Sequence, residues 1–141
     1  MLQVVAAIIE RDGKILVGQR KPEQSHPLQW EFPGGKVEAG ESPEQALTRE
    51  LQEELGVNAA VSREITRYRY AYPGKNPIEL IFLEVTGFEG EPRNLIYQEM
   101  RWQPKHTLAE LDFLEGDWDF LHGFYTEVYG NSNQESGTRG E

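Results

Sequence analysis

The sequence contains no cysteine, which excludes disulfide bonds, thiol nucleophiles and cysteine metal ligands. It also lacks an apolar run of the about 18 residues that a membrane-spanning helix requires. Basic residues are scarce, with 14 lysines and arginines against 24 aspartates and glutamates, and the formal net charge is −10. This charge disfavours binding to nucleic acid polymers or anionic membranes. The N-terminus MLQVVAAIIERDGK lacks the basic region and cleavage site of a signal peptide, so we expect a strand there. The absence of cysteine fits a cytoplasmic protein, which is the expected location.

The 141 residues suffice for one domain with its own hydrophobic core. Valine and isoleucine dominate residues 3–9, which predicts a buried strand, and the turn Asp12-Gly13 leads to a second strand at 15–20. Further strands are predicted at 59–72, 79–85 and 96–102, with a C-terminal helix at 118–129. We expect a single domain over residues 1–130, followed by a disordered polar tail at 131–141.

A helix is predicted between Ser42 and Gly56. Ser42 suits the N-cap, proline follows at the first helical position, and Gln45 completes a capping box. Gly56 suits the left-handed residue that follows a helix. Leucines at intervals of four form the apolar stripe of this helix: Leu47, Leu51 and Leu55.

Three glutamates of this helix form an acidic cluster. Glu50, Glu53 and Glu54 stand at i, i+3 and i+4, which gathers their side chains on one face. Like charges at this spacing destabilise a helix, so the cluster needs a compensating partner. Mg²⁺ is the natural one, because it prefers carboxylate oxygens, water and phosphate. The pattern therefore indicates metal-assisted chemistry on a phosphate compound, with a solvated acidic face as the alternative interpretation.

Residues 35–57, GKVEAGESPEQALTRELQEELGV, resemble the Nudix box, G-x5-E-x7-R-E-U-x-E-E-x-G-U with U a bulky aliphatic residue. Every fixed position is filled: Gly35, Glu41, Arg49, Glu50, Leu51, Glu53, Glu54, Gly56 and Val57. The chain is therefore identified as a member of the Nudix hydrolase superfamily. The resemblance implies an α/β fold, an α/β/α sandwich with a mixed β-sheet, and hydrolysis of phosphoanhydride bonds.

The resemblance also implies the roles of the box residues. Glu53 and Glu54 are expected as direct ligands of Mg²⁺, for which Mn²⁺ can substitute. Glu50 is expected as a further ligand or as the general base. The carbonyl group of Gly34 is expected to complete the metal site.

Four other positions are assigned by the same resemblance. Arg49 and Glu41 are expected to form an ion pair that braces the loop and the helix. Gly35, like Gly34, permits backbone geometry that other residues avoid. Glu99 is a candidate for an additional metal ligand, and a surface glutamate is the alternative.

Four residues are candidates for substrate binding. Arg20 matches an arginine that contacts the substrate in MutT-like enzymes, with a surface arginine as the alternative. Asp117 is expected either to hydrogen-bond the base or to cap the C-terminal helix. Phe82 and Trp118 are candidates for stacking on a base, or for packing in the core.

The strings VVAAIIERDGKILVGQR, WEFPGGKVEAGE and FEGEP resemble small bacterial MutT-type proteins. That group includes 8-oxo-dGTP diphosphatases and CTP or dCTP pyrophosphohydrolases. The resemblance implies a Mg²⁺-dependent release of nucleoside monophosphate and pyrophosphate, by a monomer or homodimer, with both substrate classes open. A non-catalytic Nudix-like nucleotide-binding module is the alternative from another class, although this chain retains every glutamate of the box.

Overall fold

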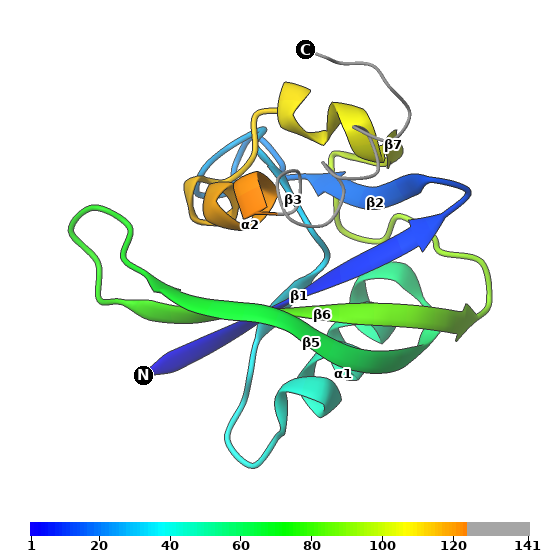
Figure 1. Ribbon diagram of the computed structural model, residues 1–141, viewed down its shortest axis with the longest axis horizontal. Coiled ribbons are helices and arrows are strands. Elements are labelled where there is room, and N and C mark those ends of the chain that lie inside the picture. Colours follow the sequence, from blue (N-terminus) through cyan, green and yellow to red (C-terminus); the bar gives the residue numbers. More distant parts are fainter. Residues whose placement is uncertain (124–141) are drawn as a thin grey trace.

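Helices cover both faces of a mixed β-sheet in the computed structural model, which describes residues 1–123 (Figure 1). Along the chain the elements are β1 (Leu2–Arg11), β2 (Lys14–Gln19), β3 (Trp30–Glu31), β4 (Gly34–Lys36), α1 (Pro43–Leu55), β5 (Asn58–Tyr70), β6 (Ile78–Glu89), β7 (Glu99–Pro104), two 3₁₀ helices (Lys105–Glu110 and Glu115–Asp117) and α2 (Trp118–Gly123). No helix within these residues combines the length and the apolar character needed to cross a membrane.

The strands follow the order β3-β2-β1-β6-β5, with β4 paired to β1 and β7 paired to β2. β1 and β6 run parallel, from Leu2 opposite Ile78 to Ile9 opposite Val85. The other pairs are antiparallel, so the sheet is mixed, as expected from the sequence. β1 lies at its centre, which explains why residues 3–9 are almost continuously apolar rather than alternating.

Alternate residues of the central strands build two cores, one on each face of the sheet. Val5, Ala7 and Ile9 of β1 face α1, where they join Leu47 and Leu51. On the opposite face, intervening residues of β1 and residues of β6 join residues of the first 3₁₀ helix, of the loop after it and of α2 in the second core: Ala6, Ile8, Leu80, Phe82, Leu108, Phe113, Phe120 and Leu121. This division produces the expected α/β/α sandwich.

The predicted boundaries of α1 are confirmed. The Ser42 Oγ accepts a hydrogen bond from the backbone N–H of Gln45 at 3.1 Å, and the Gln45 side chain accepts one from the Ser42 N–H at 2.9 Å. Gly56 ends the helix at φ 69°, in the left-handed region, and its N–H donates to the carbonyl of Gln52.

Several short elements escaped the sequence prediction. β3, β4 and both 3₁₀ helices are too short to show a hydrophobic period. β7 begins at Glu99 rather than at residue 96. The predicted C-terminal helix begins at Trp118 as α2, but its remainder and the predicted tail at 131–141 lie outside the described residues.

Candidate active site

A cleft of about 340 Å³ brings together residues from distant parts of the chain. One group in its wall consists of Gly34 and Gly35 of β4 and Glu54 near the end of α1. A second group consists of residues that follow β2, belong to β3 or precede α2: Arg20, Glu31 and Asp117. The cleft therefore joins part of the predicted metal site to two of the predicted substrate-binding residues.

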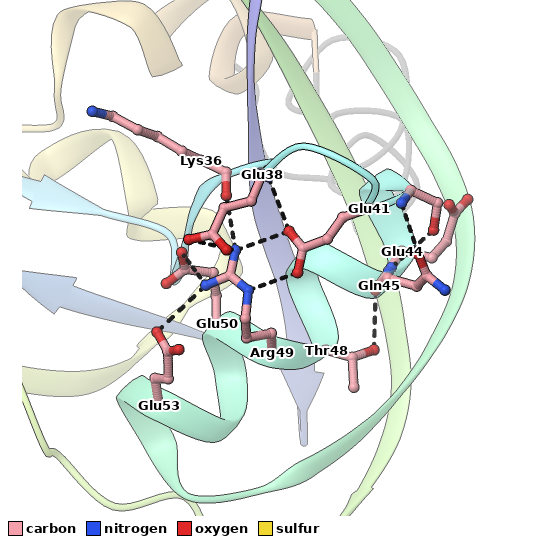
Figure 2. Close-up of polar contacts among 10 residues, drawn as sticks. Lys36, Glu38, Glu41, Glu44, Gln45, Thr48, Arg49, Glu50 and Glu53 are labelled. Atoms are coloured by element: carbon pink, nitrogen blue, oxygen red, sulfur yellow. Dashed lines mark hydrogen bonds and ion pairs between the residues drawn. The ribbon is translucent and has the colours of Figure 1, made fainter.

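Arg49 forms ion pairs both with Glu41, in the loop between β4 and α1, and with glutamates of α1 itself (Figure 2). Its Nε and one amino group donate to the two oxygens of Glu41 at 2.7 and 3.0 Å, and that amino group also donates to the Lys36 carbonyl. The other amino group lies 3.2 Å from Glu50 and 3.5 Å from Glu53. Hydrogen bonds from Arg49 lower the pKa of Glu41 to about 2. The expected ion pair is present, and Arg49 also supplies positive charge to the glutamate cluster.

Glu54 is the buried glutamate of the cluster, with only 7% of the residue exposed. Its Oε1 accepts hydrogen bonds from the Gly34 N–H at 3.1 Å and from the Tyr97 hydroxyl at 2.9 Å. Burial, and then the neighbouring Glu50 carboxyl, raise the pKa of Glu54. Burial and the charge of Glu54 likewise raise the pKa of Tyr97. The Glu54 carboxyl thus lies beside a second carboxyl group, in a buried setting that favours its protonated form, which is the condition that a divalent cation relieves.

Two glycines of β4 stand where a side chain would meet atoms of β1 or of α1. Gly34 has φ 154°, and a β-carbon there would overlap the carbonyl oxygen of Val5. At Gly35 a β-carbon would come within 2.5 Å of the Glu50 carboxylate. The two glycines thus let β4 approach both β1 and the acidic face of α1.

The remaining candidate ligands lie farther from this arrangement. The Glu53 side chain is 58% exposed, and within residues 1–123 its only polar contact is with Arg49. Glu99 pairs with Arg101 at 3.0 Å and does not line the cleft. Among residues 1–123, no three His, Asp or Glu side chains form a ready-made metal cluster. The carboxylates of α1 still match Mg²⁺ in chemistry, because all their donors are oxygens.

The other end of the cleft contains a buried carboxyl group without a partner. Asp117 is 6% exposed, and its side chain makes no hydrogen bond or ion pair within the described residues. Burial, and then the charge of Glu31, raise the pKa of Asp117 to about 8. If Asp117 capped α2, its carboxyl group would accept a hydrogen bond from the Phe120 N–H. That N–H instead donates to the Tyr68 hydroxyl at 3.1 Å, so the capping hydrogen bond is not formed. A neutral Asp117 presents one donor and one acceptor to whatever occupies the cleft.

Arg20 lines the cleft, but its side chain already has partners. It donates to the Ser25 carbonyl at 2.7 Å and to the Ser25 hydroxyl at 3.0 Å. It also pairs with Glu31 at 3.0 Å. Burial raises the pKa of Glu31, and Arg20 opposes that rise. Arg20 therefore orders the loop that follows β2 and compensates the charge of Glu31.

Comparison with known proteins identifies the family. The model of the NUDIX domain matches residues 1–124. The chain belongs to the Nudix family. It is 40% identical to the CTP pyrophosphohydrolase of Escherichia coli, over 88% of this chain and 91% of that protein. It is 38% identical to the 8-oxo-dGTP diphosphatase of Haemophilus influenzae, over 92% and 95% respectively.

The fold of this Nudix chain agrees with those of solved relatives. The solution structure of the E. coli ORF135 protein superposes with a TM-score of 0.79 at 35% identity, covering 99% of this chain and 95% of that one. Nudix hydrolases generally need a divalent metal, which accords with the donor set on α1. The Nudix box thus corresponds to β4, the following loop and α1.

The structure corrects one predicted substrate contact and does not bring another to the cleft. Phe82 is fully buried in the core, stacked on Phe120 at 4.3 Å and on Tyr68 at 5.6 Å, so no base can reach its ring. Of the two alternatives for Phe82, base stacking is therefore wrong and packing in the core is confirmed, because its ring is covered by the cluster that includes Phe120 of α2. Trp118 packs edge-on against Phe113 and does not line the cleft.

Sequence reasoning missed three residues of this Nudix site. Glu31 stands in the motif EFPGG, but nothing in the pattern showed that it would face Asp117. His26 lines the cleft and lies 5.0 Å from the ring of Tyr72, although its spacing suggested no special role. Tyr97 contacts Glu54 across 43 positions of sequence, a separation that no local pattern reveals.

Proposed function

We propose that this protein is a Mg²⁺-dependent nucleoside triphosphate pyrophosphohydrolase of the MutT type. The observation that carries the proposal is the single cleft that joins the Glu54–Gly34 pair to the unpartnered Asp117. One end has carboxylate oxygens suited to a metal–phosphate complex, and the other has a hydrogen-bonding group suited to a base edge. The two relatives named above are a pyrophosphohydrolase and a diphosphatase of nucleoside triphosphates, which supports the same reaction.

Glu53 and Glu54 are the proposed direct ligands, Glu50 is a ligand or the general base, and the Gly34 carbonyl and Glu99 are further ligands. Bound Mg²⁺, or Mn²⁺, would neutralise phosphate charge and acidify a coordinated water. A water oxygen bonds to a phosphorus of the triphosphate chain while the anhydride P–O bond breaks, and a carboxylate of α1 accepts the proton. Nucleoside triphosphate and water thus give nucleoside monophosphate and pyrophosphate.

The first candidate substrate is 8-oxo-dGTP, and the second is CTP or dCTP. The second is favoured by the 40% identity to the E. coli CTP pyrophosphohydrolase. A neutral Asp117 carboxyl group has one hydrogen-bond donor and one acceptor. Both 8-oxoguanine and cytosine have an acceptor next to a donor on one edge, so either base can form the two matching hydrogen bonds. Removal of oxidised nucleotides from a cytoplasmic pool, which prevents DNA damage, is the physiological role we assign, to a monomer or homodimer.

The test is pyrophosphate release from a panel of nucleotides, with Mg²⁺ and with chelator. The panel contains 8-oxo-dGTP, dGTP, CTP, dCTP and 5-methyl-dCTP. We expect Mg²⁺-dependent release with a large kcat/KM advantage for one nucleotide, and Asp117→Asn should change that preference more than the Mg²⁺ requirement. No release from any nucleotide would overturn the proposal. Binding of the same nucleotides by calorimetry would then support a non-catalytic module.

A further inference from the structure

The Tyr97 hydroxyl and the Gly34 N–H converge on the same oxygen of Glu54. They lie 2.9 and 3.1 Å from Oε1, which uses both acceptor positions of that oxygen. Within residues 1–123, no backbone N–H or side-chain hydroxyl donates to Oε2. The protein therefore holds Glu54 by Oε1, and the Glu50 carboxyl is a further polar neighbour of the Glu54 carboxylate.

Tyr97 is itself fixed in place. Its backbone N–H donates to the Asn94 Oδ1 at 2.7 Å, and its carbonyl accepts from the Asn94 Nδ2 at 3.0 Å. Its ring lies against Gly18 of β2, where a β-carbon would come within 2.5 Å of three ring carbons. The Leu95 N–H donates to the Glu54 carbonyl at 3.1 Å, which ties the same segment to the end of α1. These contacts fix the position of the Tyr97 ring and the direction in which its hydroxyl points.

We propose that Tyr97 is a positioning residue that presents Glu54 to Mg²⁺ as a ligand through a single oxygen. The inference rests on the metal site proposed above. Groups that orient a ligand by hydrogen bonding commonly change metal affinity 10- to 100-fold when removed. Mg²⁺ demands compact octahedral geometry, whereas Ca²⁺ accepts carboxylates through one or both oxygens. Occupying Oε1 therefore favours Mg²⁺ over Ca²⁺.

The test compares Tyr97→Phe with Tyr68→Phe by Mn²⁺ binding, measured as free Mn²⁺ by electron paramagnetic resonance, with Mg²⁺ and Ca²⁺ as competitors. Tyr68 is a matched control, because its part-buried hydroxyl also makes two hydrogen bonds, to the Gly116 carbonyl and from the Phe120 N–H. For Tyr97→Phe we expect a Mn²⁺ affinity roughly 10- to 100-fold lower and a competition ratio shifted toward Ca²⁺. The affinity of Tyr68→Phe should equal that of the wild type.

Asn94→Ala provides a second variant, because it releases the segment but keeps the hydroxyl. It should weaken Mn²⁺ binding in the same direction and by less. Saturating Mg²⁺ should restore most of the kcat of Tyr97→Phe, since the hydroxyl does not touch the substrate.

Wild-type Mn²⁺ affinity in folded Tyr97→Phe would overturn the inference while leaving the proposed function intact. Absence of Mn²⁺ binding by the wild-type protein would instead reject the metal site itself, and with it both proposals.

Discussion

At the level of single residues, Glu53 differs from Glu50 and Glu54 in being largely exposed. Replacing it with glutamine should leave the fold intact, since it supports no core contact. Turnover should nevertheless fall by several orders of magnitude, because a neutral amide is a poor Mg²⁺ ligand. Steady-state kinetics on the preferred nucleotide would measure this loss, with Glu44→Gln in the first turn of α1 as the control. Near wild-type turnover for Glu53→Gln would remove it from the metal site.

Asp117 makes stability depend on pH in a direction that follows from its environment. In the folded protein its pKa is about 8, far above the roughly 3.9 of an unfolded chain. Between these values the folded state holds a proton that the unfolded state has released, so rising pH favours unfolding, by at most about 1.4 kcal/mol per pH unit.

Asp117→Asn removes this titration while keeping the shape of the side chain. Relative to the wild type, the variant should gain stability steadily from pH 5 to pH 8. Urea unfolding at several pH values would show the trend. Parallel stability curves for the two proteins would mean that Asp117 is ionised in the fold.

At the level of elements, the N-terminus of α1 depends on a reciprocal cap. Ser42→Ala removes the acceptor for the Gln45 N–H and should cost about 1 kcal/mol of unfolding free energy. Ser62→Ala on β5 is the control, since within residues 1–123 its exposed hydroxyl hydrogen-bonds only to Glu84, and its effect should stay within about 0.5 kcal/mol. Urea denaturation would give both values. Equal effects would show that the cap contributes nothing specific.

β4 lies against β1 through Gly34, and this contact offers a second test. Gly34→Ala combines backbone strain with overlap of the Val5 carbonyl, whereas Gly13→Ala introduces strain at φ 77° with no atom within 4 Å. Strain alone costs on the order of 1–3 kcal/mol. Gly34→Ala should therefore lower the melting temperature more than Gly13→Ala does. Similar losses would mean that β4 can move away from β1 without cost.

The predictability of the elements depended on their length. α1 has caps at both ends and a leucine stripe, so its boundaries followed from local chemistry. β3 and β4 comprise two and three residues, and they exist because β2 and β1 offer them hydrogen-bonding partners. No periodic pattern develops over such short segments, so only the assembled sheet defines them.

For the whole molecule, the net charge of −10 and the adjacent carboxyls of Glu50 and Glu54 predict stabilisation by divalent cations. Mg²⁺ at about 100 times its dissociation constant should add about 2.7 kcal/mol of stability, and chelator should remove it. Differential scanning calorimetry with NaCl at matched ionic strength separates site binding from general screening. An equal rise in melting temperature with NaCl would attribute the effect to screening alone.

The sequence by itself determined the Nudix box, the limits of α1 and the central apolar strands. These features depend on spacing within one segment, where the periods of helix and strand fix which side chains meet. Tertiary structure alone decided that Phe82 is core, that Glu31 faces Asp117, and that Tyr97 holds Glu54. Each of those outcomes joins residues from separate elements, and the pairing and register of the sheet bring them together.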